Sequence, residues 1–337
     1  MSPKIKAHTV KPGEKLFDIE DEPMPKGAWW WWFWLFFIDN PKDPNKPRQL
    51  MILWSTKNVR KISCNDLKIE IGEPRNGNVL DGAVAAWYFD GEKMHHNYLL
   101  ELCKIKVEKD GLSTDSKTPT SFTIRDVVNR IRIGDKFDFV AEAKGTHDFV
   151  KPSFHGNMFV GDKGYSITKI NRLDLKGAVD GKPIKGTAYF QRVFVNAPAI
   201  PWYWSDFHFE NGGVLTYTNQ MVFRKAVKKH IAFFDGKELY ELNDILVKKK
   251  GGELPEFSVS GETPEYQIRF TVKSYAHSFW QFKKKSLGFI PNKLTYNEYP
   301  STISDFEFVD KKTGKKTTSK ELGKAVGNAE HTTGYLL

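Results

Sequence analysis

A run of ten aromatic and aliphatic residues constrains the fold of this chain more than any other feature. It covers residues 29–38, reads WWWWFWLFFI, and contains five tryptophans and three phenylalanines. The run is too short to cross a bilayer as a helix, which needs about 20 apolar residues. As a β-strand, it places Trp30, Trp32 and Trp34 on one face and further aromatic residues on the other.

A strand that is aromatic on both faces needs apolar cover on both faces. One arrangement that provides it is the wall of a β-barrel whose interior holds a large apolar ligand. The other is a core strand that packs on both sides without any ligand. The strand alone does not decide between these two interpretations.

The composition limits the classes of partner. The 337 residues include 51 Lys and Arg against 41 Asp and Glu, and the sequence pI is near 9.2. Such an excess favours polyanions or an anionic membrane surface. The basic clusters lie beside Gly, Asp or Thr, as in solvated turns, and no nucleic-acid-binding motif accompanies them. We therefore expect no nucleic-acid partner, while peripheral contact with an anionic membrane stays open.

The cysteines and the N-terminal residues bear on localisation. Cys64 and Cys103 are the only cysteines, and they have neither metal-site nor disulfide-framework spacing. Residues 1–22 are charged and lack the apolar centre of a signal peptide. We expect a cytoplasmic protein in a reducing compartment, without a transmembrane segment.

Turn signals recur along the whole chain. Asp-Gly or Asn-Gly pairs occur at residues 90–91, 180–181, 211–213 and 235–236, each between two apolar stretches. These pairs supply the positive φ angles that tight antiparallel hairpins need. Many short strands joined by such turns predict an all-β chain of barrels or sandwiches.

Three segments refine this prediction. Residues 121–133 fit either a short helix or a pair of strands, and residues 319–325 fit one turn of helix. The Pro-rich residues 196–201 disfavour a central strand. We place a domain junction there, which predicts an N-terminal barrel over residues 1–195 and a C-terminal barrel over residues 196–337.

Three separated blocks carry a resemblance to a known family. They are the aromatic strand with its following turn (27–55), a central block (164–218) and a C-terminal block (327–335). In order and spacing they resemble the hydroxyneurosporene synthase (carotenoid hydratase) and AttH-like family, to which plant tocopherol cyclases and fungal Diels–Alderases are distantly related. The resemblance implies two lipocalin-like antiparallel β-barrels in tandem and a hydrophobic, isoprenoid- or polyene-like ligand.

One departure from the family concerns its acid. The hydratases carry Asp-His-Asn shortly after a Gly-x-x-Tyr sequence, and the aspartate is their implied proton donor. Here residues 186–189 match Gly-x-x-Tyr, but Gln191, Arg192 and Val193 follow. Because a glutamine amide has no proton of useful acidity, the resemblance does not carry over the hydration step.

Other residues are candidates for acid chemistry on an alkene. Such chemistry needs a protonated carboxyl group in a dry pocket and aromatic faces that stabilise a carbocation. Asp206 follows the aromatic triplet 202–204, and Glu330, with His331, lies in the C-terminal block. A turn or cap carboxylate for Asp206, and a structural hydrogen bond for Glu330, are the alternatives.

The remaining candidates are predicted to bind the ligand. If Arg192 points inward with Phe190 or Phe194, it can hold a carboxylate or phosphate at the cavity mouth, and otherwise it is an outward surface charge. We also predict that one of the tryptophans at 30, 32 and 34 lines a cavity together with Trp202 or Trp204. The predicted ligand-binding residues are Trp30, Trp32, Trp34, Tyr189, Gln191, Arg192, Trp202, Trp204 and His208.

Two functions from different classes remain. His95 and His96 are adjacent and would point to opposite faces of a strand, and no phosphate-binding loop or serine-hydrolase motif occurs, so we expect no metal and no cofactor. The first function is a cofactor-independent lyase or isomerase of the hydratase or cyclase type. The second is a non-catalytic, lipocalin-like carrier of an apolar ligand, and a sugar-binding module with outward tryptophans is a third. The oligomeric state stays open.

Overall fold

The chain is nearly all β in its computed structural model, which confirms the fold class predicted from sequence. The structure describes residues 16–19, 24–71, 75–125, 127–143, 150–151, 156–157, 164–222, 225–286 and 290–336. Contacts divide the chain into two compact units. The first contains the described residues of Met1–Asp39, Gln49–Tyr88 and His96–Ala197, and the second contains Asn40–Arg48, Phe89–His95 and the described residues of Pro198–Leu337.

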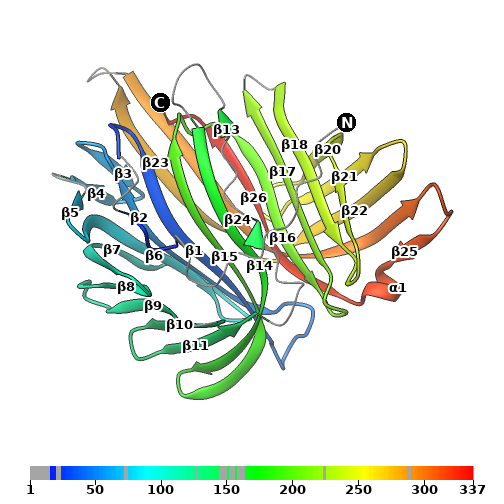
Figure 1. Ribbon diagram of the computed structural model, residues 1–337, viewed down its shortest axis with the longest axis horizontal. Coiled ribbons are helices and arrows are strands. Elements are labelled where there is room, and N and C mark those ends of the chain that lie inside the picture. The colour runs from blue at the N-terminus through cyan, green and yellow to red at the C-terminus, as the bar shows by residue number, and fades with distance from the viewer. Residues whose placement is uncertain are drawn as a thin grey trace. The chain divides into compact units, whose positions relative to one another are not determined.

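A closed antiparallel barrel forms the first unit (Figure 1). In order around the ring, its strands are β11 (Phe137–Glu142), β10 (Val128–Ile133), β9 (Thr120–Arg125), β8 (Gly111–Thr114), β7 (Met94–Glu108), β6 (Val79–Phe89), β2 (Arg48–Lys57), β1 (Trp29–Ile38), β15 (Lys182–Asn196) and β14 (Gly164–Val179). Pairing between β11 and β14 closes the ring. Short additional strands are β3 (Ile62–Cys64), β4 (Leu67–Ile69), β5 (Arg75–Asn76), β12 (Val150–Lys151) and β13 (Gly156–Asn157).

A second large antiparallel sheet forms the second unit and curls around its own aromatic core. In order across the sheet, its strands are β19 (Leu239–Leu242), β18 (Lys225–Phe234), β17 (Val214–Val222), β16 (Trp202–Phe209), β26 (Ala325–Gly334), β24 (Ile290–Asp310), β22 (Tyr266–Ser274), β21 (Glu256–Glu262) and β20 (Ile245–Lys250). Two more strands, β23 (Ser278–Ser286) and β25 (Lys316–Thr318), pair with β24.

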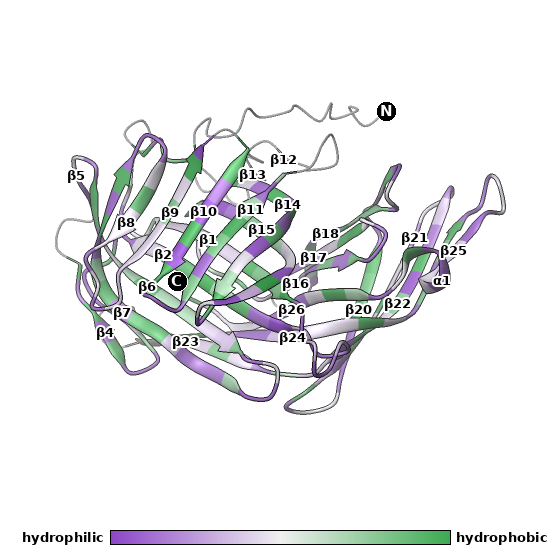
Figure 2. Cartoon of the chain, turned by 90° about the horizontal axis from the view of Figure 1, so that it is seen from below, coloured by the Kyte–Doolittle hydropathy of each residue, from purple (hydrophilic) through white to green (hydrophobic). Residues whose placement is uncertain are grey.

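Local sequence explains most of the connections. The four predicted Asp-Gly and Asn-Gly turns all join antiparallel strands, and Asp180 and Gly181 adopt φ angles of 51° and 71° between β14 and β15. Of residues 121–133, left open between helix and strands, 121–125 belong to β9 and 128–133 to β10. Buried and exposed residues alternate from Asn129 to Ile133 along β10. Figure 2 shows the mixture of hydrophilic and hydrophobic residues along the strands.

The predicted turn of helix is also present as α1 (Ser319–Leu322). The Thr318 hydroxyl accepts a hydrogen bond from the Lys320 backbone N–H, and the Glu321 carboxylate accepts from the Thr318 backbone N–H. This reciprocal cap starts the helix. Gly323, with a φ angle of 77°, ends it.

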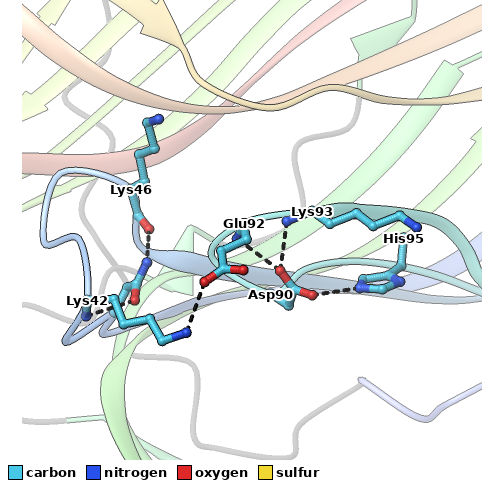
Figure 3. A network of polar contacts seen from close by, with 7 residues as sticks. Lys42, Lys46, Asp90, Glu92, Lys93 and His95 are labelled. Atoms are coloured by element: carbon cyan, nitrogen blue, oxygen red, sulfur yellow. Dashed lines mark hydrogen bonds and ion pairs between the residues drawn. The ribbon is translucent and has the colours of Figure 1, made fainter.

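Two loops from the N-terminal half of the chain belong to the second unit and form a surface network (Figure 3). Lys42 Nζ lies 2.9 Å from Glu92 Oε1, and His95 Nε2 lies 2.8 Å from Asp90 Oδ2. Burial opposes ionisation of Asp90, but hydrogen bonds from His95 and from two backbone N–H groups outweigh it and lower the Asp90 pKa to about 2. His95 thus takes part in a turn-stabilising contact.

Candidate functional site

The inner face of β1 carries three of the tryptophans predicted to bind a ligand. Trp30, Trp32 and Trp34 are almost fully buried and belong to the core of the first barrel. The ring centroid of Trp34 lies 4.8 Å from that of Phe190 and 5.0 Å from that of Phe122. The alternation of β1 places these indoles on one face of the strand, as the sequence predicted, and that face is the barrel interior.

Arg192 points into the same interior. It lies directly opposite Trp32 in the register between β1 and β15, so both side chains project from the same face. Only 7% of Arg192 is exposed, and its Cζ atom lies 5.8 Å from the Trp30 ring centroid. Its Nη2 group donates a hydrogen bond of 2.9 Å to the Asp18 carbonyl oxygen. The inward alternative for Arg192 is therefore the observed one.

Tyr189 and Gln191 project from the other face of β15. Gln191 lies opposite Phe33 and Tyr189 opposite Leu35, both of which point away from the barrel interior. The Tyr189 hydroxyl donates a hydrogen bond of 2.9 Å to Gln191 Oε1. The position that resembles the family's acid position is thus outside the first barrel and lies on the face opposite to Arg192.

A second group of predicted residues lies on one face of the sheet in the second unit. On β16, Phe207 and Phe209 point into the aromatic core, whereas Trp204, Asp206 and His208 point to the opposite face. All three of these outward side chains are nonetheless buried. Strand pairing brings residues of β26 and β24 alongside them.

Glu330 is fixed on this face by two donors. It lies opposite Trp204, another of the predicted site residues, on the neighbouring strand. Its carboxylate accepts a hydrogen bond of 2.9 Å from the indole Nε1 of Trp202 and another from the Tyr296 hydroxyl. The two donors are the polar atoms of aromatic side chains whose ring centroids lie 5.6 Å apart.

Further polar groups complete a carboxyl cluster, which we define as Asp206, His208, Glu298, Asn328 and Glu330. Asp206 Oδ1 lies 2.9 Å from His208 Nε2, and Asn328 Nδ2 donates a long hydrogen bond of 3.4 Å to Glu298 Oε2. Asp206 and Glu298 are both fully buried. Three carboxyl groups and one imidazole therefore share a single buried sheet face.

This arrangement is suited to acid–base chemistry. Burial and repulsion between neighbouring carboxylates disfavour the charged form of a carboxyl group, whereas donated hydrogen bonds favour it, so the balance of these effects decides which group can release a proton. Proton transfer from a positioned side chain contributes about 10²- to 10⁴-fold to a reaction rate. The carboxyl cluster is thus the part of the described chain in which the predicted catalytic residues Asp206 and Glu330 come together.

His331, the neighbour of Glu330, points the other way, into the second unit's core. Its ring stacks on Tyr203, with the centroids 4.6 Å apart and the planes at 10°. Burial first, and then the positive charge of Lys249, lower the His331 pKa to about 4. His331 therefore belongs to a different environment from the carboxyl cluster.

Glu298, Asn328 and Tyr296 were missed by sequence reasoning. They lie in strands of mixed composition, and only the register of β24 and β26 brings them beside Glu330 and Asp206. The one available signal was the alternation of Tyr296 with Glu298, which places both on one face of a strand.

The described residues form neither a metal site nor a membrane-spanning helix. No group of three or more His, Cys, Asp or Glu residues among them is arranged to hold a metal ion, and both cysteine thiols are free. Two surface hollows of about 630 Å³ and 590 Å³ lie on β6–β8 and around β20–β22, and neither contains a predicted site residue. Within the described part of the chain, no helix has the length and apolarity needed to span a membrane.

The comparisons with known proteins bear on the fold. No protein-family model matches the chain, and no curated protein matches it. The crystal structure of a protein from Nitrosomonas europaea, provisionally assigned as AttH, covers 100% of both chains with a TM-score of 0.56 and 12% sequence identity. The chain therefore shares the AttH-like, lipocalin-like fold. Outer membrane protease OmpT from Escherichia coli covers 92% of this chain with a TM-score of only 0.15.

Proposed function

We propose that this protein binds a hydrophobic, isoprenoid- or polyene-like small molecule and transforms it by acid–base chemistry. The observation that carries the proposal is the buried carboxyl cluster, in which Glu330 is held by Trp202 and Tyr296. A protonated carboxyl group donates a proton to an alkene carbon, and nearby aromatic faces stabilise the resulting carbocation. The reaction class is that of a cofactor-independent lyase or isomerase.

The roles within the cluster follow from the contacts. Glu330 faces two aromatic donors, which fix its orientation, so we assign it as the proton donor to the substrate. Asp206 Oδ1 and His208 Nε2 lie 2.9 Å apart, and this pair can take up or return a proton in the second half of the reaction. Trp204, on the same face as Asp206, offers an apolar surface for the substrate.

A carrier without catalytic activity is the second candidate. The observation that favours it is the aromatic interior of the first barrel, which resembles the lining of a lipocalin. Either function needs an apolar ligand, and the two differ in whether the carboxyl cluster reacts with it. We place both functions in a reducing, cytoplasmic compartment, where the two free thiols stay reduced.

The test is proton transfer to an acyclic carotene in detergent micelles. We incubate the purified protein with the carotene in D₂O and measure deuterium incorporation, hydration and cyclisation by mass spectrometry. Glu330→Gln and Asp206→Asn should each lower deuterium incorporation by about 100-fold or more. Glu256→Gln, which removes an exposed carboxyl group of the same unit, is the matched control and should leave the rate unchanged.

Deuterium incorporation that survives in the Glu330→Gln, Asp206→Asn double variant would contradict the assignment of the carboxyl cluster. Carotene that binds and is recovered without deuterium in the unaltered protein would favour the carrier. Introducing the family's acid as Gln191→Asp gives a further comparison, because Gln191 lies on a different strand from the cluster. Activity that appears only in this variant would show an inherited pocket whose reaction has been lost.

A further inference from the structure

Residues 16–19 lie within the core of the first barrel. Leu16, Phe17 and Ile19 are each at most 5% exposed and belong to the same hydrophobic cluster as the inward tryptophans of β1. The Phe17 ring centroid lies 5.2 Å from that of Phe122. Asp18, by contrast, is exposed. The segment therefore inserts three apolar side chains into the barrel without belonging to any of its strands.

Side chains of the barrel, rather than a strand ladder, hold the backbone of this segment. The buried indole Nε1 of Trp32 donates a hydrogen bond of 2.7 Å to the Leu16 carbonyl oxygen. Arg192 Nη2 donates one of 2.9 Å to the Asp18 carbonyl oxygen, and Arg75 donates to that of Ile19. The barrel thus presents an indole and two guanidinium groups to carbonyl oxygens, beside an apolar interior.

This set of donors suits a ligand with an anionic oxygen head and an apolar chain. A carboxylate accepts charge-assisted, bidentate hydrogen bonds from a guanidinium group, which are stronger than those to a neutral carbonyl. The aromatic rings of Trp30 and Phe194 are 5.8 Å apart and flank the inward face that carries Arg192. They provide the apolar surface that an adjoining hydrocarbon chain needs.

We propose that residues 16–19 occupy a binding site for the carboxylate-headed end of an apolar chain, and that such a ligand displaces them. The ligand carboxylate takes the place of the Asp18 carbonyl at Arg192, and its chain replaces Leu16, Phe17 and Ile19 among the aromatic rings. This site lies in the first unit, so it is separate from the carboxyl cluster and does not depend on it.

The displacement model makes a quantitative statement about affinity. A ligand that binds only the open form has an apparent Kd equal to its intrinsic Kd divided by the fraction of molecules that are open. Phe17→Ala removes one large buried ring from the segment, which shifts the closed–open equilibrium by about 10- to 100-fold. The apparent affinity for a carboxylated polyene should therefore rise by about tenfold or more in this variant.

The probes are cis-parinaric acid, a polyene carboxylate, and its methyl ester, titrated into the full chain and followed by fluorescence. Phe17→Ala should tighten binding of the acid, whereas Phe279→Ala, which removes an exposed phenylalanine ring, should leave it unchanged. Arg192→Gln should weaken binding of the acid by about tenfold or more. Because it also removes the hydrogen bond to the Asp18 carbonyl, it should leave binding of the ester unchanged or tighter. Circular dichroism confirms that each variant is folded.

Hydrogen exchange of the unaltered chain tests displacement without any substitution. Saturating cis-parinaric acid should accelerate exchange in a peptide that covers residues 16–19, because ligand binding expels them from the barrel. Absence of binding, equal affinity for acid and ester, or unchanged exchange at residues 16–19 would each overturn the proposal. None of these readouts involves proton transfer to carotene, so failure here leaves the assignment of the carboxyl cluster untouched.

Discussion

Replacing His331 by Phe tests whether burial in the second unit's core controls the acid stability of this protein. His331 stacks on Tyr203, and its pKa is lowered from 6.5 to about 4, first by burial and then by the charge of Lys249. A phenylalanine ring keeps the aromatic stack but cannot take up a proton. The variant therefore isolates the titration of a single side chain.

The sign and the size follow from proton linkage. The unfolded chain protonates His331 as the pH falls through about 6.5, whereas the folded chain resists protonation until about pH 4. Between these values the unfolded state binds more protons, so the free energy of unfolding falls as the pH falls. The difference between the His331 pKa in the unfolded and the folded chain corresponds to a decrease of about 3 kcal/mol in the free energy of unfolding. Nearly all of this decrease has occurred at pH 4. His331→Phe should not incur this loss.

The assay is urea unfolding, followed by tryptophan fluorescence at pH 7, 6, 5 and 4. The difference in free energy of unfolding between His331→Phe and the unaltered protein should shift by about 3 kcal/mol in favour of the variant from pH 7 to pH 4. Nuclear magnetic resonance of histidine-labelled protein gives the His331 pKa directly. Lys249→Met should raise that pKa, and Lys248→Met, at an exposed position, should not. A free-energy difference that is equal at pH 7 and pH 4, or a His331 that titrates near 6.5, would refute the reasoning.

Three further substitutions have definite expected outcomes. Trp34→Ala opens a cavity in the first barrel's core and should cost about 3–5 kcal/mol in urea unfolding, and a cost below about 1 kcal/mol would contradict its packing. Gly186→Ala places a Cβ atom inside the contact distance of the Phe37 carbonyl oxygen, so it should lower the melting temperature by disrupting β1–β15 pairing, and an unchanged melting temperature would refute the close approach. Asp90→Asn should cost about 1 kcal/mol at pH 7, a value reduced because the pair with His95 is solvent-exposed. Since the Asp90 pKa is lowered, that contribution is present above about pH 4 and disappears as the pH falls through about 2, so a cost that persists at pH 2 would contradict it.

Much of the fold follows from the sequence because the relevant signals are local. The Asp-Gly pair at 180–181 consists of residue types that tolerate positive φ angles, adopts such angles, and joins β14 to β15 as predicted. Residues 121–133 were ambiguous because a short segment can match more than one periodicity. Closure of the ring between β11 and β14 depends on pairing between distant segments, which no local pattern specifies.

The positions of the candidate site residues were likewise predictable only where a local pattern fixes them. Alternation correctly places the tryptophans at 30, 32 and 34 on one face of β1, and Asp206 with Trp204 and His208 on one face of β16. Whether the β1 tryptophans share a cavity with those of β16 stays a prediction, as does ligand binding at each predicted residue. Glu298 joins Glu330 only through the register of two strands, and that register is not encoded near either residue.

The alternation of side chains along β15 also separates the proposed acid chemistry from the proposed binding of a carboxylate at Arg192. Gln191 and Arg192 are neighbours in sequence, yet they project from opposite faces of one strand, so they cannot both contact the head of one bound ligand. No Asp or Glu occurs in β15, so the strand that resembles the family's acid-bearing strand cannot supply a proton-donating carboxyl group. If this chain performs acid chemistry, the proton must come from other strands, and the carboxyl cluster on β16, β24 and β26 provides three buried carboxyl groups for it. β15 contributes instead a buried cation, Arg192, whose chemistry is to bind an anion.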